Sequence, residues 1–346
     1  MTLTSAVTEQ EQEAVETAQV TRRRRHPLLQ YILWRIIRIA FVALLVTFVA
    51  FVLVALVPGD PAQRAGGEDA TAEQLNAIRT AMGLDQSFAS RYVGYLQGLL
   101  HGDLGSSVSL FRGESVVSIV AHAVPVTLSL AVVTMFLVIL VGVPAGAVAA
   151  IWQGSVIDRF VTGFSTVALA VPAFVLGPIL VLVFAVRLGW LPALGFVPLS
   201  DGFVPWLSHL LLPALALGFH LMAEVARQVR AAIVGELQES YIRTARAKGL
   251  KLRKIVGKHA MKNAGVAVIT VVGLQFGVIV GGSVIVESIF NLPGLGHLAY
   301  NAVVRSDFPV IQAIVLLTAL VVLLVNFIVD LSYLYFDPRL RRPAGA

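Results

Sequence analysis

Cysteine is absent from this chain of 346 residues. Without a thiol, the sequence provides no disulfide, thiol nucleophile, iron–sulfur cluster or cysteine-ligated zinc site, and it leaves the redox compartment undetermined. Charged residues are also scarce, at 13% of the chain, whereas soluble domains carry about a quarter. Hydrophobic residues make up 57%. The composition therefore indicates a protein whose solvent is the lipid bilayer.

Catalytic patterns are missing as well. The phosphate-binding loop G-x-x-x-x-G-K-[ST] requires Ser or Thr after its lysine, but Gly257-Lys258 is followed by His259. No serine or histidine stands out as a nucleophile with a positioned base. His220 has only Glu224 at a spacing that suits a metal ligand, so we expect no metal site. The sequence predicts neither an enzyme nor a cofactor bound by this chain.

Long apolar runs are abundant. Six segments reach the roughly 20 apolar residues that a membrane crossing needs. They cover residues 33–57, 122–151, 160–187, 205–226, 264–286 and 309–335. Pro125 and Pro144 lie in the second segment and Pro172 and Pro178 in the third, where we expect kinks. The sequence predicts an all-α integral membrane protein with six transmembrane helices, the first over residues 28–57.

Basic residues orient these spans. Residues 1–27 form a polar tail that ends in a basic cluster and lacks the apolar run of a cleavable signal, so we expect a disordered tail. If that tail is cytoplasmic, few Lys and Arg residues fall on the outer side. They are Arg64, Arg79, Arg91, Arg112, Arg187 and Arg305. The positive-inside rule then places both termini, including residues 338–346, in the cytoplasm. It also explains the net charge of +6 without nucleic-acid binding.

Two connections are longer than turns. Residues 58–118 contain the capping-box pattern Thr71 to Gln74, a helical spacing that ends near Gly83, and a second helical pattern at about 88–100. We expect an extracytoplasmic helical subdomain here. The other connection, residues 227–263, belongs to a core domain over residues 119–337 and carries ten basic residues. Its spacing predicts a short helix over 236–248 that ends at Gly249.

Several motifs carry a family resemblance. They are LVPGDP at 56–61, GDLG at 102–105, YIRTARAKGL at 241–250, HAMKN at 259–263, ESIFNLPGLG at 287–296 and DPR at 337–339. In this order and spacing, the chain resembles the membrane subunits of binding-protein-dependent ABC importers. It is most similar to the dipeptide, oligopeptide and nickel branch, and there to the first, B-type permease. Arg243-Thr244-Ala245 replaces the Glu-Ala-Ala triplet of the wider superfamily, which is usual in the peptide branch, and His259 to Lys262 replaces its Ile-x-Leu-Pro.

The resemblance implies a subunit of an ATP-driven peptide importer in the plasma membrane of a prokaryote. A second, C-type permease would complete the path, two ATPase subunits would hold ATP and Mg, and an external binding protein would deliver the solute. The implied coupling helix, which docks on an ATPase subunit, involves Tyr241, Arg243, Thr244, Ala245, Ala247, Lys248 and Gly249. A merely basic, lipid-facing connection is the alternative for this loop. Nickel chelates or haem remain alternative solutes, and a self-contained channel or secondary transporter is the alternative function.

Polar residues inside the spans are the remaining candidates, because such groups face a partner or a water-filled route. They are His220, Glu224, Gln275, Ser283, Glu287, Asn326 and Asp330. Each has two interpretations, a lining of the translocation path or a hydrogen-bond network within the bundle. Glu224 has a third, a simple ion pair with Arg227 or Arg230. A stripe of small residues from Gly273 to Ser283 suggests close packing against the partner permease, and a lining of the substrate path is the alternative for the same stripe.

Overall fold

The structure is a computed structural model that describes residues 27–56, 60–67, 70–250 and 254–336. The described part is helical and contains no strand, as the sequence predicted. The predicted tails, apart from Pro27, and the DPR motif at 337–339 lie outside the described residues.

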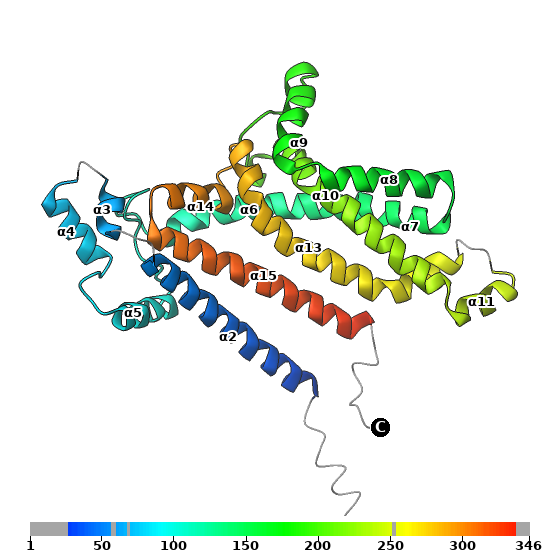
Figure 1. Ribbon diagram of the computed structural model, residues 1–346, viewed down its shortest axis with the longest axis horizontal. Coiled ribbons are helices and arrows are strands. Elements are labelled where there is room, and N and C mark those ends of the chain that lie inside the picture. The colour runs from blue at the N-terminus through cyan, green and yellow to red at the C-terminus, as the bar shows by residue number, and fades with distance from the viewer. Residues whose placement is uncertain (1–26, 57–59, 68–69, 251–253, 337–346) are drawn as a thin grey trace, which may run out of the picture.

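Five helical segments are long and apolar enough to cross a membrane. Four are the single helices α2 (Pro27–Leu56), α10 (Phe203–Leu237), α13 (Met261–Ile289) and α15 (Phe308–Phe336). The fifth joins α6 (Val116–Leu137), one π-helical turn (η1, Val138–Gly142) and α7 (Val143–Ile151). In Figure 1, α2, α10, α13 and α15 slope in the same direction across the view, with α2 beside α15. Pro125 lies inside α6, and Pro144 lies just after the π-helical turn η1; proline and π-helical turns are both known causes of kinks in long helices.

The third predicted span is broken rather than kinked. Helix α8 (Val156–Ala170) and helix α9 (Ala173–Leu180), which continues as the π-helical η2 (Val181–Arg187), meet at an angle of 100°. Val171 is extended because the following Pro172 disfavours a helical conformation at that position. The bend gives the chain a sixth possible span only if the two helices count together. Figure 1 shows α9 projecting away from the other helices.

Helix α10 is the centre of the bundle and contacts α6, α7, α8 and α13. Leu210, Leu221 and Val225 on its length are fully buried, as is Ile279 of α13. In lipid, helix association depends on close packing, which small residues permit. A β-carbon at Gly146 of α7 would lie 2.3 Å from the carbonyl oxygen of Ala226, so only glycine allows this approach.

The region between the first two spans folds into α3 (Pro61–Gly66), α4 (Ala72–Ala81) and α5 (Phe88–Leu100), here called the α3–α5 subdomain. The capping box is present as predicted: Thr71 Oγ1 accepts from Gln74 N, and Gln74 Oε1 accepts from Thr71 N. Gly83 has a φ of 61°, which suits a residue that turns the chain after a helix. Neither α3 nor α14 (Leu295–Val304) was predicted from the sequence.

The loop after α5 is fastened to the start of α15 by one carboxylate. Asp307 is fully buried and accepts hydrogen bonds from Ser107 Oγ at 2.5 Å, Ser109 N at 3.1 Å and Leu110 N at 2.8 Å. Hydrogen bonds to a charged acceptor are stronger than those between neutral groups, so three donors on one buried carboxylate hold the loop firmly. This contact joins segments about 200 positions apart in the sequence.

Candidate functional site

A short helix is present where the sequence predicted one, but its predicted start was wrong. Residues 236–237 belong to the end of α10, and the short helix is α11 (Ser240–Ala247). The two helices separate because Glu239 is extended, with φ −66° and ψ 150°. Gly249 ends the hairpin with a φ of 76°, as the predicted glycine stop requires. In Figure 1, α11 lies at the opposite end of the molecule from the α3–α5 subdomain.

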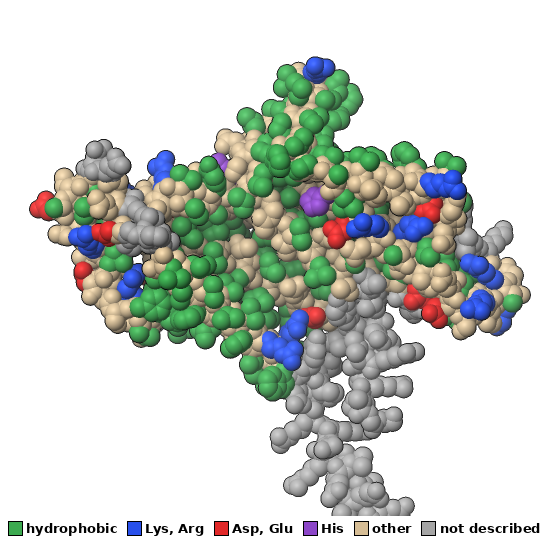
Figure 2. All heavy atoms as spheres, in the orientation of Figure 1, with side chains coloured by type: hydrophobic (Ala, Val, Ile, Leu, Met, Phe, Trp, Pro, Cys, Tyr) green, Lys and Arg blue, Asp and Glu red, His purple; other side chains and the backbone are tan. Residues whose placement is uncertain are grey.

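The inner face of α11 differs from the face that the spacing suggested. Ile242 is fully buried and Ala245 is half-buried, and α11 contacts the π-helical segment η4 (Ile255–Ala260), where Ile255 is also fully buried. The other predicted coupling residues are exposed. They are Tyr241, Arg243, Thr244, Ala247, Lys248 and Gly249. An apolar anchor thus holds a short helix whose outer face is polar and basic, and Figure 2 shows basic side chains gathered at this end.

Tyr241 also fastens α11 to the end of α10. Its hydroxyl donates a hydrogen bond of 2.6 Å to Glu236 Oε2. Arg243 donates to the carbonyl oxygen of Gln238 at 3.4 Å, in the two-residue link between the helices. The side chain of Tyr241 keeps 36% of its surface exposed, so its ring remains accessible while its hydroxyl is engaged.

An ion pair that the sequence did not reveal braces α10 just before α11. Asp158 of α8 accepts from Arg230 Nε at 2.5 Å and Arg230 Nη2 at 2.8 Å, and also from Gly154 N at 2.8 Å. The Asp158 side chain is only 6% exposed. The available signal was the Ser155-x-x-Asp158 capping pattern at the start of α8, where Asp158 N donates to Ser155 Oγ.

This pair corrects one alternative for Glu224. Arg230 is held by Asp158, and Glu224 instead accepts a hydrogen bond of 3.0 Å from Gln228 Nε2, one turn along the same helix. The spacing of four residues makes that contact a local one. His220, one turn earlier on α10, is half-buried. Among the described residues, no group of three or more His, Cys, Asp or Glu side chains suits a metal ion.

Glu287 of α13 is held by hydrogen bonds from neighbouring helices. It is fully buried and accepts hydrogen bonds from Thr127 Oγ1 at 2.7 Å and from His297 N at 2.9 Å. Thr127 Oγ1 in turn accepts from Leu295 N at 2.8 Å. The carboxylate therefore joins α13, α6 and the first turn of α14, where a negative charge is favourable. These contacts match the network interpretation of Glu287.

The other predicted polar residues occupy separate places. Asp330 of α15 forms an ion pair with Arg35 of α2, and Asn326 lies one turn earlier, half-buried. Ser283 Oγ donates to the carbonyl oxygen of Val280 in its own helix at 3.0 Å. Gln275 is buried, and its Oε1 has no hydrogen-bond partner within the described part of the chain. Glu224 and Ser283 thus make contacts within their own helices, whereas Glu287 and Asp330 make contacts between helices.

The glycine stripe of α13 packs partly inside this chain. A β-carbon at Gly273 would lie 2.3 Å from Val329 Cγ2 of α15, so this glycine serves the contact between α13 and α15. Packing against a partner was therefore the wrong interpretation for Gly273. At Gly281 no atom of the described residues lies within 4 Å of such a β-carbon, so that part of the stripe is left uncovered by them.

Solved structures with a similar arrangement belong to an ABC transporter. Inward-facing conformations of the MetNI methionine ABC transporter match with a TM-score of 0.54 and 19% sequence identity. That match covers 64% of this chain and 97% of the other chain. At this identity the similarity shows the fold.

Relatives and family descriptions match over most of the chain. The "Probable peptide ABC transporter permease protein y4tP" of Sinorhizobium fredii is 38% identical over 90% of this chain and 99% of its own length. The "Glutathione transport system permease protein GsiC" of Pectobacterium atrosepticum is 40% identical over 91% and 99%. Residues 28–131 match the N-terminal component of binding-protein-dependent transport systems, and residues 142–342 match their inner membrane component. The chain therefore belongs to the family of binding-protein-dependent transport system inner membrane components, the permease subunits of ABC importers.

Proposed function

We propose that this permease carries peptides, of dipeptide to oligopeptide size, through the plasma membrane of a prokaryote. It forms the path together with a second, C-type permease and takes its driving force from two ATPase subunits that hold ATP and Mg. An external binding protein delivers the solute, and both termini of the permease lie in the cytoplasm. The names of the relatives, a peptide permease and glutathione permeases, support a peptide-like solute.

The observation that carries this proposal is the construction of α11. A transmitting element must be short, stiffly attached and exposed on its outer face. Ile242 supplies the buried attachment, the Tyr241–Glu236 hydrogen bond joins α11 to α10, and Asp158 holds Arg230 on α10. Small side chains on the outer face, such as Ala247, leave room for a partner backbone to approach, and Lys248 offers a charge to acidic groups.

The exposed apolar arm of α9 and η2 supports the second permease as a partner. Phe174, Ile179 and Val186 on this arm are 56%, 49% and 68% exposed. One side of α9 packs on α10 and α13, whereas these three side chains are left uncovered by the described part of the chain. A second membrane subunit alongside would cover this surface by the close packing that joins helices in lipid.

Valine at Gly249 tests the role of α11. Gly249 has a φ of 76°, which costs a side-chain-bearing residue about 1–2 kcal/mol, and a β-carbon there would meet nothing within 4 Å. The substitution therefore distorts the hairpin without a clash in the core. We expect Gly249→Val to insert normally but to lose solute-stimulated ATP hydrolysis in vesicles that contain the assembled transporter.

Gly102 provides the matched control. It also has a φ of 76° and open space around its β-carbon position, but it follows α5 at the other end of the molecule. Gly102→Val should keep full stimulation. Normal stimulation in Gly249→Val would refute coupling through α11. Solute uptake by the permease without ATPase subunits would instead favour a self-contained channel or secondary transporter.

A further inference from the structure

An apolar groove runs between the first and last spans. Its cavity volume is about 540 Å³, and α2 and α15 form most of its walls. The aliphatic side chains that line it include Leu45, Val49 and Leu53 of α2, Val303 in the last turn of α14, and Ile311 and Val315 of α15. Leu53 is 59% exposed and Val303 is 61% exposed, so the described residues leave these walls uncovered. Figure 2 shows a largely hydrophobic surface over α2 and α15.

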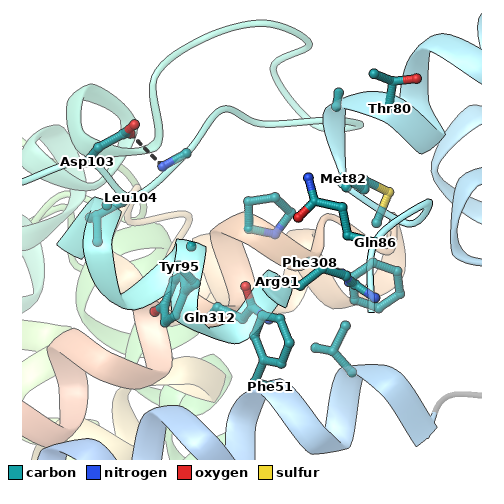
Figure 3. Close-up of a pocket in the computed structure, with 17 residues that line it drawn as sticks. Phe51, Thr80, Met82, Gln86, Arg91, Tyr95, Asp103, Leu104, Phe308 and Gln312 are labelled. Carbon is teal, nitrogen blue, oxygen red and sulfur yellow. Dashed lines mark hydrogen bonds between the residues drawn. The ribbon is translucent and has the colours of Figure 1, made fainter. Parts of the chain in front are cut away.

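A second cavity, of about 350 Å³, adjoins this groove at the α3–α5 subdomain. Val54 and Phe308 line both cavities. Figure 3 shows side chains from three elements around the second cavity: Phe51 from α2, Arg91 and Tyr95 from α5, and Phe308 and Gln312 from α15. The apolar groove thus leads to a cavity that carries a cation.

Arg91 is a half-buried cation without an anion. Its guanidinium lies 5.4 Å from the centre of the Phe51 ring, and it takes part in none of the ion pairs among the described residues. Partial burial lowers the pKa of Arg91, which reflects the loss of hydration without a compensating charge. The nearby Asp60 is held by Arg79, and Asp103 accepts from Gly105 N.

Further polar side chains lie beside Arg91 in the second cavity. The Tyr95 hydroxyl is buried without a hydrogen-bond partner in the part of the chain that the structure describes. Burial raises the pKa of Tyr95 to about 12, so the hydroxyl keeps its proton and can donate. Gln312 is 9% exposed and lines the same cavity with its amide. Asp85 lines an adjoining cavity with Arg91 but forms no ion pair with it.

Helix α5 has the character of a helix at a membrane boundary. Tyr92 lies against α2, where its hydroxyl is 3.1 Å from Thr47 Oγ1, and its ring packs edge-on to Phe48. Val93 and Leu100 on the same helix are 51% and 86% exposed. Aromatic side chains with polar tips concentrate at the level of lipid headgroups. The cavity with Arg91 therefore lies where a headgroup would be, and the apolar groove lies where acyl chains would be.

We infer that these two adjoining cavities form a phospholipid site, with the phosphate on Arg91 beside Tyr95 and Gln312 and an acyl chain in the groove between α2 and α15. The arginine fork matches the geometry of a phosphate. The apolar walls match a chain of methylene groups and offer no polar partner except Ser306. This inference depends on the membrane location of the protein and not on the proposed solute.

Photolabelling tests the groove directly. A photoactivatable residue at Leu53 in the assembled transporter, reconstituted in phosphatidylglycerol vesicles, is expected to label phospholipid. The control carries the photoactivatable residue at Val132 of α6, which is 57% exposed but lines neither cavity. Labelling of lipid from position 132 should not depend on Arg91. A crosslink from Leu53 to the second permease in place of lipid would overturn the inference.

Charge removal tests the headgroup cavity. Native mass spectrometry measures the amount of phospholipid that co-purifies with the transporter. Arg91→Gln should lower this amount about tenfold, because charge-assisted hydrogen bonds are lost. Arg91→Lys keeps the charge and should lower it less. Arg305→Gln removes an exposed charge that lines neither cavity and should change nothing. Excess phosphatidylglycerol should compete for the site, whereas diacylglycerol and glycerol phosphate alone should not. Equal losses in the Arg91→Gln and Arg305→Gln variants would refute a specific site.

Discussion

The ion pair between Asp158 and Arg230 yields the sharpest quantitative prediction. In Arg230→Met the Asp158 carboxylate, 6% exposed, keeps only the Gly154 N–H at 2.8 Å and the Thr162 hydroxyl at 3.4 Å. Stranding one charge of a buried pair costs 3–5 kcal/mol. Because Gly154 still donates, we expect about 3 kcal/mol, at the low end of that range.

Asp158→Asn and the double variant complete the cycle that measures the coupling energy between Asp158 and Arg230. Asp158→Asn keeps an acceptor, and Arg230 is 28% exposed and can be hydrated, so we expect a loss of about 1.5 kcal/mol. The double variant leaves no stranded charge and should cost about 2 kcal/mol. The two single losses together exceed the loss in the double variant, which gives a coupling energy of about 2.5 kcal/mol.

Unfolding in detergent micelles measures this double-mutant cycle, and ATPase assays on the assembled transporter measure its consequence. Arg230→Met should insert into the membrane but should lower solute-stimulated ATP hydrolysis, because α10 loses its brace to α8 just before α11. The double variant should recover part of the stability. Losses that add within about 0.5 kcal/mol would show that the pair does not brace α10 and would refute the reasoning.

Asp307→Asn removes the negative charge that accepts hydrogen bonds from Ser107 Oγ, Ser109 N and Leu110 N. The backbone amides of residues 107–111 should then exchange hydrogen about tenfold faster. Unchanged exchange rates would contradict the role of Asp307. Gly146→Ala places a β-carbon against the Ala226 carbonyl and should lower the free energy of unfolding by about 1–3 kcal/mol. Gly163→Ala on α8 meets nothing within 4 Å, so it should leave stability equal or slightly higher, and equal losses at both glycines would contradict the packing argument.

Local chemistry made part of this structure predictable. The capping box at Thr71 located α4 because both of its hydrogen bonds lie within four residues. Gly249 marked the end of the α11 hairpin, because a left-handed turn after a helix favours glycine regardless of surroundings. The spans followed from the length of the apolar runs, and α2 and α15 match them closely.

Long-range contacts escaped prediction for physical reasons. Asp158 and Arg230 are separated by 72 residues, and no periodicity links them. Ile242 was missed as the anchor because α11 has only 8 residues, too few turns for spacing to define a face. Pro172 signalled a disturbance, but its size of 100° depends on the packing of α8 and α9 and not on proline alone.

The length of α10 has a mechanical consequence. Its 35 residues form one helix, which measures about 52 Å at 1.5 Å per residue, well beyond the roughly 30 Å hydrocarbon layer. One rod therefore reaches from the buried centre of the bundle to the hairpin that bears α11. A sideways displacement of about 4 Å at the hairpin would tilt such a rod by roughly 4°. Because α10 is one rod, this tilt would also move the helices that pack along its length.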